Sequence, residues 1–120
     1  MTRAQQARLT YKKGIWGEYA ACFFLMCKGY RIKKRRFKTK VGEIDIIAER
    51  GGTVCFVEVK HYHSFERGIY AITPKQQQRL HRAAEWYQTK YHITAPLRFD
   101  AIILVSWQWP WHIKNILIDM

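Results

Sequence analysis

The feature that most constrains the fold is a pair of glycines, Gly51 and Gly52, between two runs of strand-forming residues. The runs, residues 43–49 and 53–60, are rich in β-branched and apolar side chains, which favour strands. Two consecutive glycines can both adopt positive φ at little cost, as a two-residue hairpin loop requires. The sequence therefore predicts an antiparallel hairpin over residues 43–60.

The register of this hairpin brings three charged side chains together. A two-residue loop places Arg50 opposite Thr53. If the pairing continues one residue at a time along both strands, Asp45 lies opposite Glu58. Residues directly opposite each other share one face of the sheet and lie about 4.5–5.5 Å apart. Lys60 joins Glu58 on that face because strand side chains alternate, so we expect the three charges to converge.

Two carboxylates pressed together repel each other unless one is protonated or a cation lies between them. Carboxylate oxygens suit Mg²⁺ or Mn²⁺, and Mg²⁺ uses few protein ligands. We expect Asp45 and Glu58 to hold such an ion, with the backbone carbonyl of Val59 as a further ligand. The ion would polarise a phosphodiester, and Lys60 would hold the attacking hydroxide or neutralise the phosphate. An ordinary cross-strand charge cluster is the alternative.

The second run of the hairpin favours the functional interpretation. Residues 54–57 are apolar on both faces, so we expect this strand to be central and covered. Charges on a covered strand are costly and usually serve a purpose.

The composition indicates a compact protein. Hydrophobic residues make up 48% of the 120 residues, which is enough for one domain, residues 1–120, with a sizeable core. No apolar run reaches the length of a membrane span, and the first residues lack the apolar core of a signal peptide. We therefore expect a cytoplasmic protein without a membrane partner. Cys22, Cys27 and Cys55 cannot all pair, and we expect reduced, packed thiols.

Positive charge dominates the chain and gathers in residues 28–40. Lys and Arg total 21 against 9 Asp and Glu, a formal net charge of +12. Such a concentration suits a polyphosphate partner and favours nucleic acid, with DNA as the expected form. A solvated strand edge guarded by lysines is the alternative. The candidate phosphate contacts in this segment are Lys33, Lys34, Arg35, Arg36, Lys38 and Lys40.

The three-and-four spacing of apolar residues predicts a first helix over residues 12–28, which Gly29 would end. Glu18 lies on the otherwise apolar face of this helix. It either favours the helix dipole or points at the carboxylate site.

A second helix begins with Thr73 as its cap, Pro74 in its first turn and Gln76 three residues after the cap. Its buried stripe consists of Leu80, Ala83, Ala84, Tyr87 and Tyr91. The polar residues near its start either follow a phosphate backbone or form the outer face of an amphipathic helix. They are Lys75, Gln78 and Arg79.

The remaining segments complete a mixed α/β fold. We expect an edge strand over residues 30–37, a turn over 38–42, a loop over 61–72, and strands over 97–106 and 112–118. The order αβββαββ includes a strand, a crossover helix and a further strand. That arrangement requires a parallel pair, so the fold class is α/β with a mixed central sheet flanked by helices.

Two further features have more than one interpretation. Trp107, Trp109 and Trp111 alternate, so they either stack on unpaired bases, fill a dimer interface or pack across a hairpin corner. Asp100 either supports the carboxylate site from the neighbouring strand or pairs with Arg98.

A set of motifs spread over nearly the whole chain resembles the YraN-type family of small bacterial proteins. The set comprises Gly17-Glu18-Tyr19-Ala20, Gly29-Tyr30, Gly42-Glu43-Ile44-Asp45, Phe56-Val57-Glu58-Val59-Lys60, Lys75 and Arg98-Phe99-Asp100. The resemblance implies membership of the PD-(D/E)xK nuclease superfamily, with a restriction-endonuclease-like fold similar to that of archaeal Holliday-junction resolvases. It also implies Asp45 and Glu58 as metal ligands, Lys60 as the catalytic lysine and Glu18 as a further active-site group.

We therefore expect a Mg²⁺- or Mn²⁺-dependent endonuclease that hydrolyses phosphodiester bonds of nucleic acid, in particular branched or single-stranded DNA. The alternative is a non-catalytic nucleic-acid-binding module or adaptor that retains a nuclease fold. Cleavage of a junction needs two sites, which a homodimer would supply, and no stretch of the sequence identifies an interface.

Overall fold

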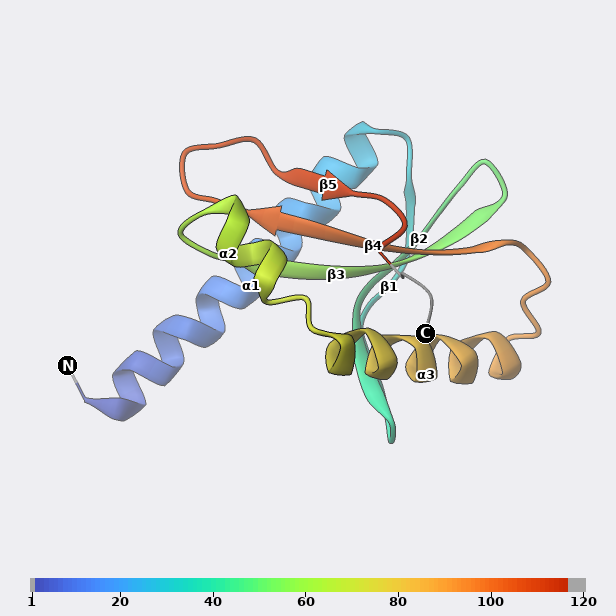
Figure 1. Ribbon diagram of the computed structural model, residues 1–120, viewed down its shortest axis with the longest axis horizontal. Coiled ribbons are helices and arrows are strands. Elements are labelled where there is room, and N and C mark those ends of the chain that lie inside the picture. The colour runs from blue at the N-terminus through green and yellow to red at the C-terminus, as the bar shows by residue number, and fades with distance from the viewer. Residues whose placement is uncertain (1, 117–120) are drawn as a thin grey trace.

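Five strands form one mixed sheet among the described residues, which in this computed structural model are 2–116, with the side chains of 6–13 not described (Figure 1). The spatial order follows the chain order: β1 (Arg31–Thr39), β2 (Gly42–Arg50), β3 (Thr53–His61), β4 (Leu97–Leu104) and β5 (Trp111–Ile113). The β3–β4 pair is parallel and the other pairs are antiparallel. The α/β fold class and the central position of β3 are thereby confirmed.

The hairpin register is the one that the sequence predicts. Gly51 and Gly52 have φ values of 58° and 80°, so both occupy the left-handed region that a type I′ turn requires. Arg50 pairs with Thr53, and the pairing continues to Ile46 with Val57.

Helix α1 (Arg3–Cys27) already begins at Arg3, so the predicted start at residue 12 is wrong. A capping box starts it: Gln5 N donates to Thr2 Oγ1 over 3.1 Å, and Thr2 N donates to Gln5 Oε1 over 2.9 Å. The helix ends as predicted, because Gly29, at φ 89°, allows the chain to turn away. Within the described part of the chain, no helix combines the length and apolarity of a membrane span.

The crossover from β3 to β4 contains two helices. Residues 61–72, predicted to be a loop, include α2 (Phe65–Tyr70), which Ser64 caps by accepting from Arg67 N. Helix α3 (Pro74–Lys90) starts at the predicted Thr73 cap, where Gln76 N donates to Thr73 Oγ1 over 3.2 Å.

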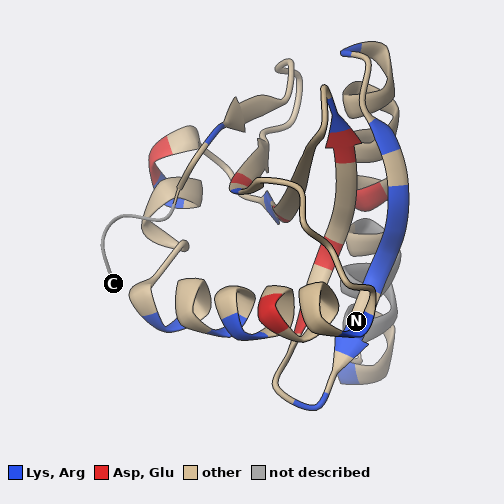
Figure 2. Cartoon of the chain, turned by 90° about the vertical axis from the view of Figure 1, so that its right-hand side faces the viewer, with Lys and Arg blue, Asp and Glu red and all other residues tan. Residues whose placement is uncertain are grey.

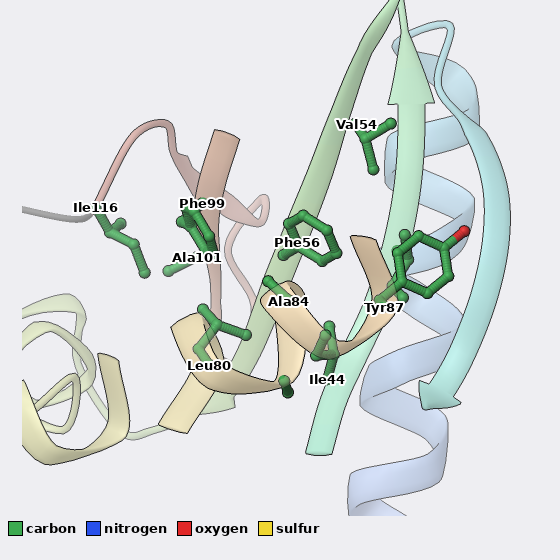
Figure 3. Close-up of a cluster of buried hydrophobic side chains, with 11 residues drawn as sticks. Ile44, Val54, Phe56, Leu80, Ala84, Tyr87, Phe99, Ala101 and Ile116 are labelled. Carbon is green, nitrogen blue, oxygen red and sulfur yellow. The ribbon is translucent and has the colours of Figure 1, made fainter. Parts of the chain in front are cut away.

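Apolar clusters cover both faces of β3. On one face, α3 packs against the sheet through the cluster in Figure 3, in which Phe56 of β3 lies between Leu80 and Tyr87 of α3. On the other face, Cys55 and Val57 pack under α1. Burying such side chains is worth about 1.5–3 kcal/mol each, so β3 is firmly held in the middle of the molecule. That rigidity matters because β3 also carries Glu58 and Lys60.

Two expectations about burial are wrong. Tyr91, predicted to extend the buried stripe of α3, is 40% exposed, because it is the C-terminal cap and lies beyond the part of the helix that packs on the sheet. Cys27 is a free and exposed thiol at the end of α1, whereas Cys22 and Cys55 are buried as predicted.

The expected strand over 112–118 is observed only as Trp111–Ile113, and residues 117 and 118 lie outside the described residues.

We expect Gly68→Ala to destabilise the protein by about 1–3 kcal/mol. Helix α2 packs on β4 so closely that a Cβ atom on Gly68 would lie 2.5 Å from Ile103 Cγ2. Gly14→Ala is the matched control, since nothing lies within 4 Å of a Cβ atom there and alanine favours a helix interior. Urea denaturation of both variants tests this expectation, and equal stabilities would show that α2 does not pack against β4 as described.

Candidate functional site

The site lies where β2 and β3 separate. Backbone pairing of the hairpin ends at Ile46 and Val57, and Asp45 and Glu58 occupy the next opposed positions. Asp45 bridges the widening gap with its side chain: Val59 N donates to Asp45 Oδ2 over 2.8 Å. This contact fixes the carboxylate against the central strand without using its second oxygen.

Glu58 and Lys60 lie on the α3 side of β3, two residues apart. Lys60 Nζ is 3.3 Å from Glu58 Oε1, and about four-fifths of each side chain is buried. Glu58 lines a hollow beneath the start of α3. The other residues of that hollow are Ile72, Gln76, Gln77, Leu80 and Ile116.

Burial, and after it nearby negative charge, raises the pKa values of the Asp45 and Glu58 carboxyl groups. The pKa of Asp45 rises to about 7, first through burial and then through the charge of Glu58, and the Val59 N–H only partly offsets this. Glu18 and Glu43 are near enough to raise the pKa of Asp45 further. The pKa of Glu58 is also raised, mainly by burial, with the Lys60 charge acting against the change. Lys60 therefore offsets only part of the cost of placing two carboxyl groups here.

Glu18 approaches the same region from α1. It is 6% exposed, and Arg36 Nε of β1 lies 3.0 Å from its Oε2 and 3.3 Å from its Oε1. Burial raises the pKa of Glu18, and the Arg36 charge opposes that rise. Only the Oε1 contact has hydrogen-bond geometry, so within the described residues Glu18 Oε2 is a buried acceptor that receives no hydrogen bond. The helix-dipole alternative does not account for this ion pair, because Glu18 lies in the middle of α1.

These residues fit a divalent cation in the chemistry of their donors. Asp45 and Glu58 offer hard carboxylate oxygens whose mutual repulsion a cation would relieve, and Glu18 Oε2 is an unsatisfied acceptor nearby. Among residues 2–116, no three His, Cys, Asp or Glu side chains already form a compact metal cluster. Carboxylate oxygens are ligands that suit Mg²⁺ and Mn²⁺, and Mg²⁺ uses few protein ligands. The Val59 carbonyl as a ligand stays a prediction.

Basic side chains surround this region on two elements. Figure 2 shows Lys and Arg along β1, at the edge of the sheet, and on the outer side of α3. In β1, Lys33 forms a 3.6 Å ion pair with Glu49, Lys34 lies over the Tyr91 ring, and Arg35 lies over the Tyr19 ring. These three basic residues are exposed, as are the remaining candidates Lys38, Lys40, Lys75, Gln78 and Arg79. Arg36, also a candidate, forms an ion pair with Glu18.

The sequence was compared with protein families and known relatives. The family model described as "Uncharacterised protein family UPF0102" matches residues 17–104. The chain belongs to the UPF0102 family. A UPF0102 protein of Rhodopseudomonas palustris strain HaA2 is 47% identical over 105 residues, which cover 86% of this chain and 82% of the relative. One from Sinorhizobium medicae is 42% identical over 107 residues, 87% of each chain. A UPF0102 protein of Brucella canis is 40% identical over 111 residues, which cover 91% of this chain and 88% of the relative.

The matched segment of the UPF0102 chain contains all the residues expected to act in catalysis or metal binding. Glu18, Asp45, Glu58, Val59 and Lys60 all fall within residues 17–104. The YraN-type resemblance is therefore confirmed as membership of this family. Placement in the nuclease superfamily stays a prediction.

Sequence reasoning about this UPF0102 protein overlooked Gln76 as a site residue. Gln76 lines the hollow with Glu58, and its Oε1 is buried without a hydrogen-bond partner among the described residues. In the sequence, Gln76 was noted only as the third residue after the Thr73 cap, where it supports the start of the second helix. The reciprocal bond of a full capping box would have occupied Oε1. That bond is not formed, so Gln76 contributes a buried acceptor without a described partner to the lining of this hollow.

Asp100 pairs with Arg98, which was one of its two expected interpretations. It is fully buried, 2.8 Å from Arg98 Nη2 and 2.9 Å from His112 Nε2, and Asn115 N donates to it over 3.0 Å. Its register partner is Val57, which packs on the α1 side, so Asp100 lies away from Glu58. This network stabilises the sheet and does not extend the carboxylate site.

The three alternating tryptophans do not align. Trp111 begins β5 and packs on Phe65 of α2, with ring centroids 4.6 Å apart, as the packing interpretation expects. Trp107 and Trp109 are 103% and 85% exposed in the β4–β5 connection. Base stacking or a dimer contact at these two residues stays a prediction.

Proposed function

We propose that this UPF0102 protein is a Mg²⁺- or Mn²⁺-dependent endonuclease that hydrolyses phosphodiester bonds of nucleic acid, DNA in particular. One observation carries the proposal: the half-buried carboxyl groups of Asp45 and Glu58 interact beside Lys60, on a chain with a net charge of +12. A purely structural pair of this kind would be costly, because two anions and only one cation are withdrawn from water. The basic surface on β1 and α3 supports nucleic acid as the substrate.

Each site residue has a role in this proposal. Asp45 and Glu58 hold the cation, which when bound supplies charge neutralisation and a more acidic water. Lys60 Nζ is placed beside Glu58 to hold the attacking water or to stabilise negative charge that develops on the phosphate. Glu18 supports the same site through its unsatisfied Oε2. The resemblance to the PD-(D/E)xK nuclease superfamily assigns the same residues.

We expect Lys60→Ala to lower the cleavage rate by about 10²–10³-fold, since it removes the charge that stabilises the transition state. Purified protein is incubated with labelled junction, duplex and single-stranded DNA, with Mg²⁺, with Mn²⁺ and with EDTA. Lys90→Ala is the control, because it removes the same charge from the far end of α3. Cleavage that persists in Lys60→Ala, or that does not need a divalent cation, contradicts the proposal.

The second candidate function is a non-catalytic nucleic-acid-binding module. The observation in its favour is that Lys60 already forms an ion pair with Glu58 and that Arg36 already forms one with Glu18. In that case binding to DNA weakens steeply with salt but responds neither to Mg²⁺ nor to neutralisation of Asp45. The same titrations, followed by fluorescence anisotropy, separate the two functions.

A further inference from the structure

Helix α1 exposes an apolar stripe beside the site. The stripe consists of Trp16, Tyr19, Phe23 and Met26, which are 71%, 48%, 67% and 52% exposed. Their spacing of three and four residues places them along one flank of the helix. The buried flank carries Glu18, Ala21, Cys22 and Leu25 instead. Soluble proteins seldom leave such a continuous apolar surface uncovered unless it binds something.

The stripe borders the basic strand β1. The Arg35 guanidinium lies 4.2 Å from the centroid of the Tyr19 ring, and Arg35 Nη2 donates to the Tyr19 hydroxyl over 3.2 Å. The Trp16 ring is the next along the stripe, with its centroid 6.4 Å from that of Tyr19. Aromatic faces alternating with guanidinium groups are the surface that unpaired bases and their phosphates prefer.

This surface adjoins the proposed catalytic residues. Tyr19 follows Glu18 in α1, and Arg35 precedes Arg36, the ion-pair partner of Glu18, in β1. The stripe and the Glu18–Arg36 pair thus lie on the same two elements, α1 and β1. The net charge of +12 makes a polyanion a better occupant of this flank than a second, equally positive copy of the chain.

We propose that this flank binds a single-stranded segment of nucleic acid, with unpaired bases stacked on Trp16 and Tyr19 and a phosphate on Arg35. The inference rests on the proposed function, because it takes nucleic acid as the polymer on which the site acts. It specifies the substrate class as unpaired strands or strand ends, since bases within a duplex do not present a free face for stacking.

Fluorescence anisotropy in EDTA tests this inference without cleavage. The probes are a labelled single strand and a strand of the same length that carries abasic sugars in place of bases. We expect Trp16→Ala to weaken binding of the normal strand by about fivefold or more. Trp16→Phe, which keeps an aromatic face, should retain most of the affinity. Binding of the abasic strand should be the same in wild type and Trp16→Ala.

Tyr70→Ala is the matched control, since it removes an 82% exposed ring from α2 and should leave binding unchanged. Three outcomes overturn the inference: no weakening by Trp16→Ala, equal weakening for the abasic strand, or equal weakening by Tyr70→Ala. Light scattering that shows a wild-type dimer lost in Trp16→Ala, with unchanged binding, would assign the flank to a second copy and also overturn it.

The two proposals fail separately. Base-dependent binding through Trp16 without any Mg²⁺-dependent cleavage refutes the nuclease function and leaves the binding site standing. If the protein cleaves in a Mg²⁺-dependent way but Trp16→Ala does not change its affinity for the single strand, only the stacking site is refuted.

Discussion

Replacing Asp45 with Asn should raise the stability of the metal-free protein at pH 8 by up to about 4 kcal/mol and should lower the cleavage rate at least about 100-fold. The pKa of Asp45 in the folded protein, about 7, lies above its ordinary value of 3.8, because burial and Glu58 disfavour the charged form. The folded state therefore holds this proton more tightly than the unfolded chain does, and stability is lost as the pH rises from about 4 to about 7. Asn carries no charge and avoids that loss.

Two measurements check this double effect. Urea denaturation between pH 4 and pH 8 should show a decline in wild-type stability that is smaller in Asp45→Asn. Mn²⁺ should raise the Tm of wild type but not that of the variant, because a cation that binds only the folded state stabilises it. The cleavage rate should fall at least about 100-fold. Mutation of residues that only support metal ligands already lowers metal affinity or activity by about 10–100-fold.

Glu85→Gln is the control for the loss of one negative charge, since Glu85 is an exposed acid on α3. If Asp45→Asn were less stable than wild type at pH 8, or if Mn²⁺ stabilised both proteins equally, Asp45 would not belong to a strained cation site.

Replacing Asp100 with Ala should destabilise the protein by about 3–5 kcal/mol, because it leaves the groups around a buried anion without their partner. Arg98, His112 and the Asn115 N–H all converge on this carboxylate. Burial alone would raise the pKa of Asp100, but hydrogen bonds from His112, Arg98 and Asn115 outweigh it and lower the pKa to about 2. Thermal and urea denaturation measure the loss.

The acid dependence of stability provides an independent check on Asp100. Its pKa in the folded protein lies below the ordinary 3.8, so the stabilisation is complete above about pH 4 and is lost as the pH falls through about 2. The expected loss is about 2 kcal/mol, and it should be absent in Asp100→Asn. Wild-type and Asp100→Asn curves that fall in parallel below pH 4 would contradict the assignment.

The parts of the fold that could be predicted are those that depend on neighbours in sequence. The Gly51-Gly52 turn fixes the hairpin register locally, so the opposition of residues 45 and 58 follows from the sequence alone. The Thr73 cap and the Gly29 stop are equally local. The start of α1 was missed because apolar periodicity is weak before residue 12, although Thr2 and Gln5 carry a recognisable capping box.

The parts that could not be predicted depend on partners that are far apart in the chain. Nothing local shows that Arg36 reaches Glu18 across two elements, or that Asp100 meets His112 after a strand reversal. The same limit applies to Gln76, whose place beside Glu58 depends on how α3 docks on the sheet. The strand that carries Glu58 and Lys60 could therefore be located from the sequence, whereas the long-range contacts around it could be seen only in the folded structure.

The parallel pairing of β3 with β4 has a consequence for assembly of the protein. The β1–β3 meander needs only short loops, whereas β4 joins β3 after a connection of more than thirty residues, from His61 to Leu97. Long-range pairing of this kind is slow, so β3 is a bare sheet edge while the later half of the chain is being synthesised. Charged side chains discourage intermolecular strand addition at such an edge. Glu58 and Lys60 are the acidic and basic side chains of β3, so we expect them to discourage intermolecular pairing of the nascent meander.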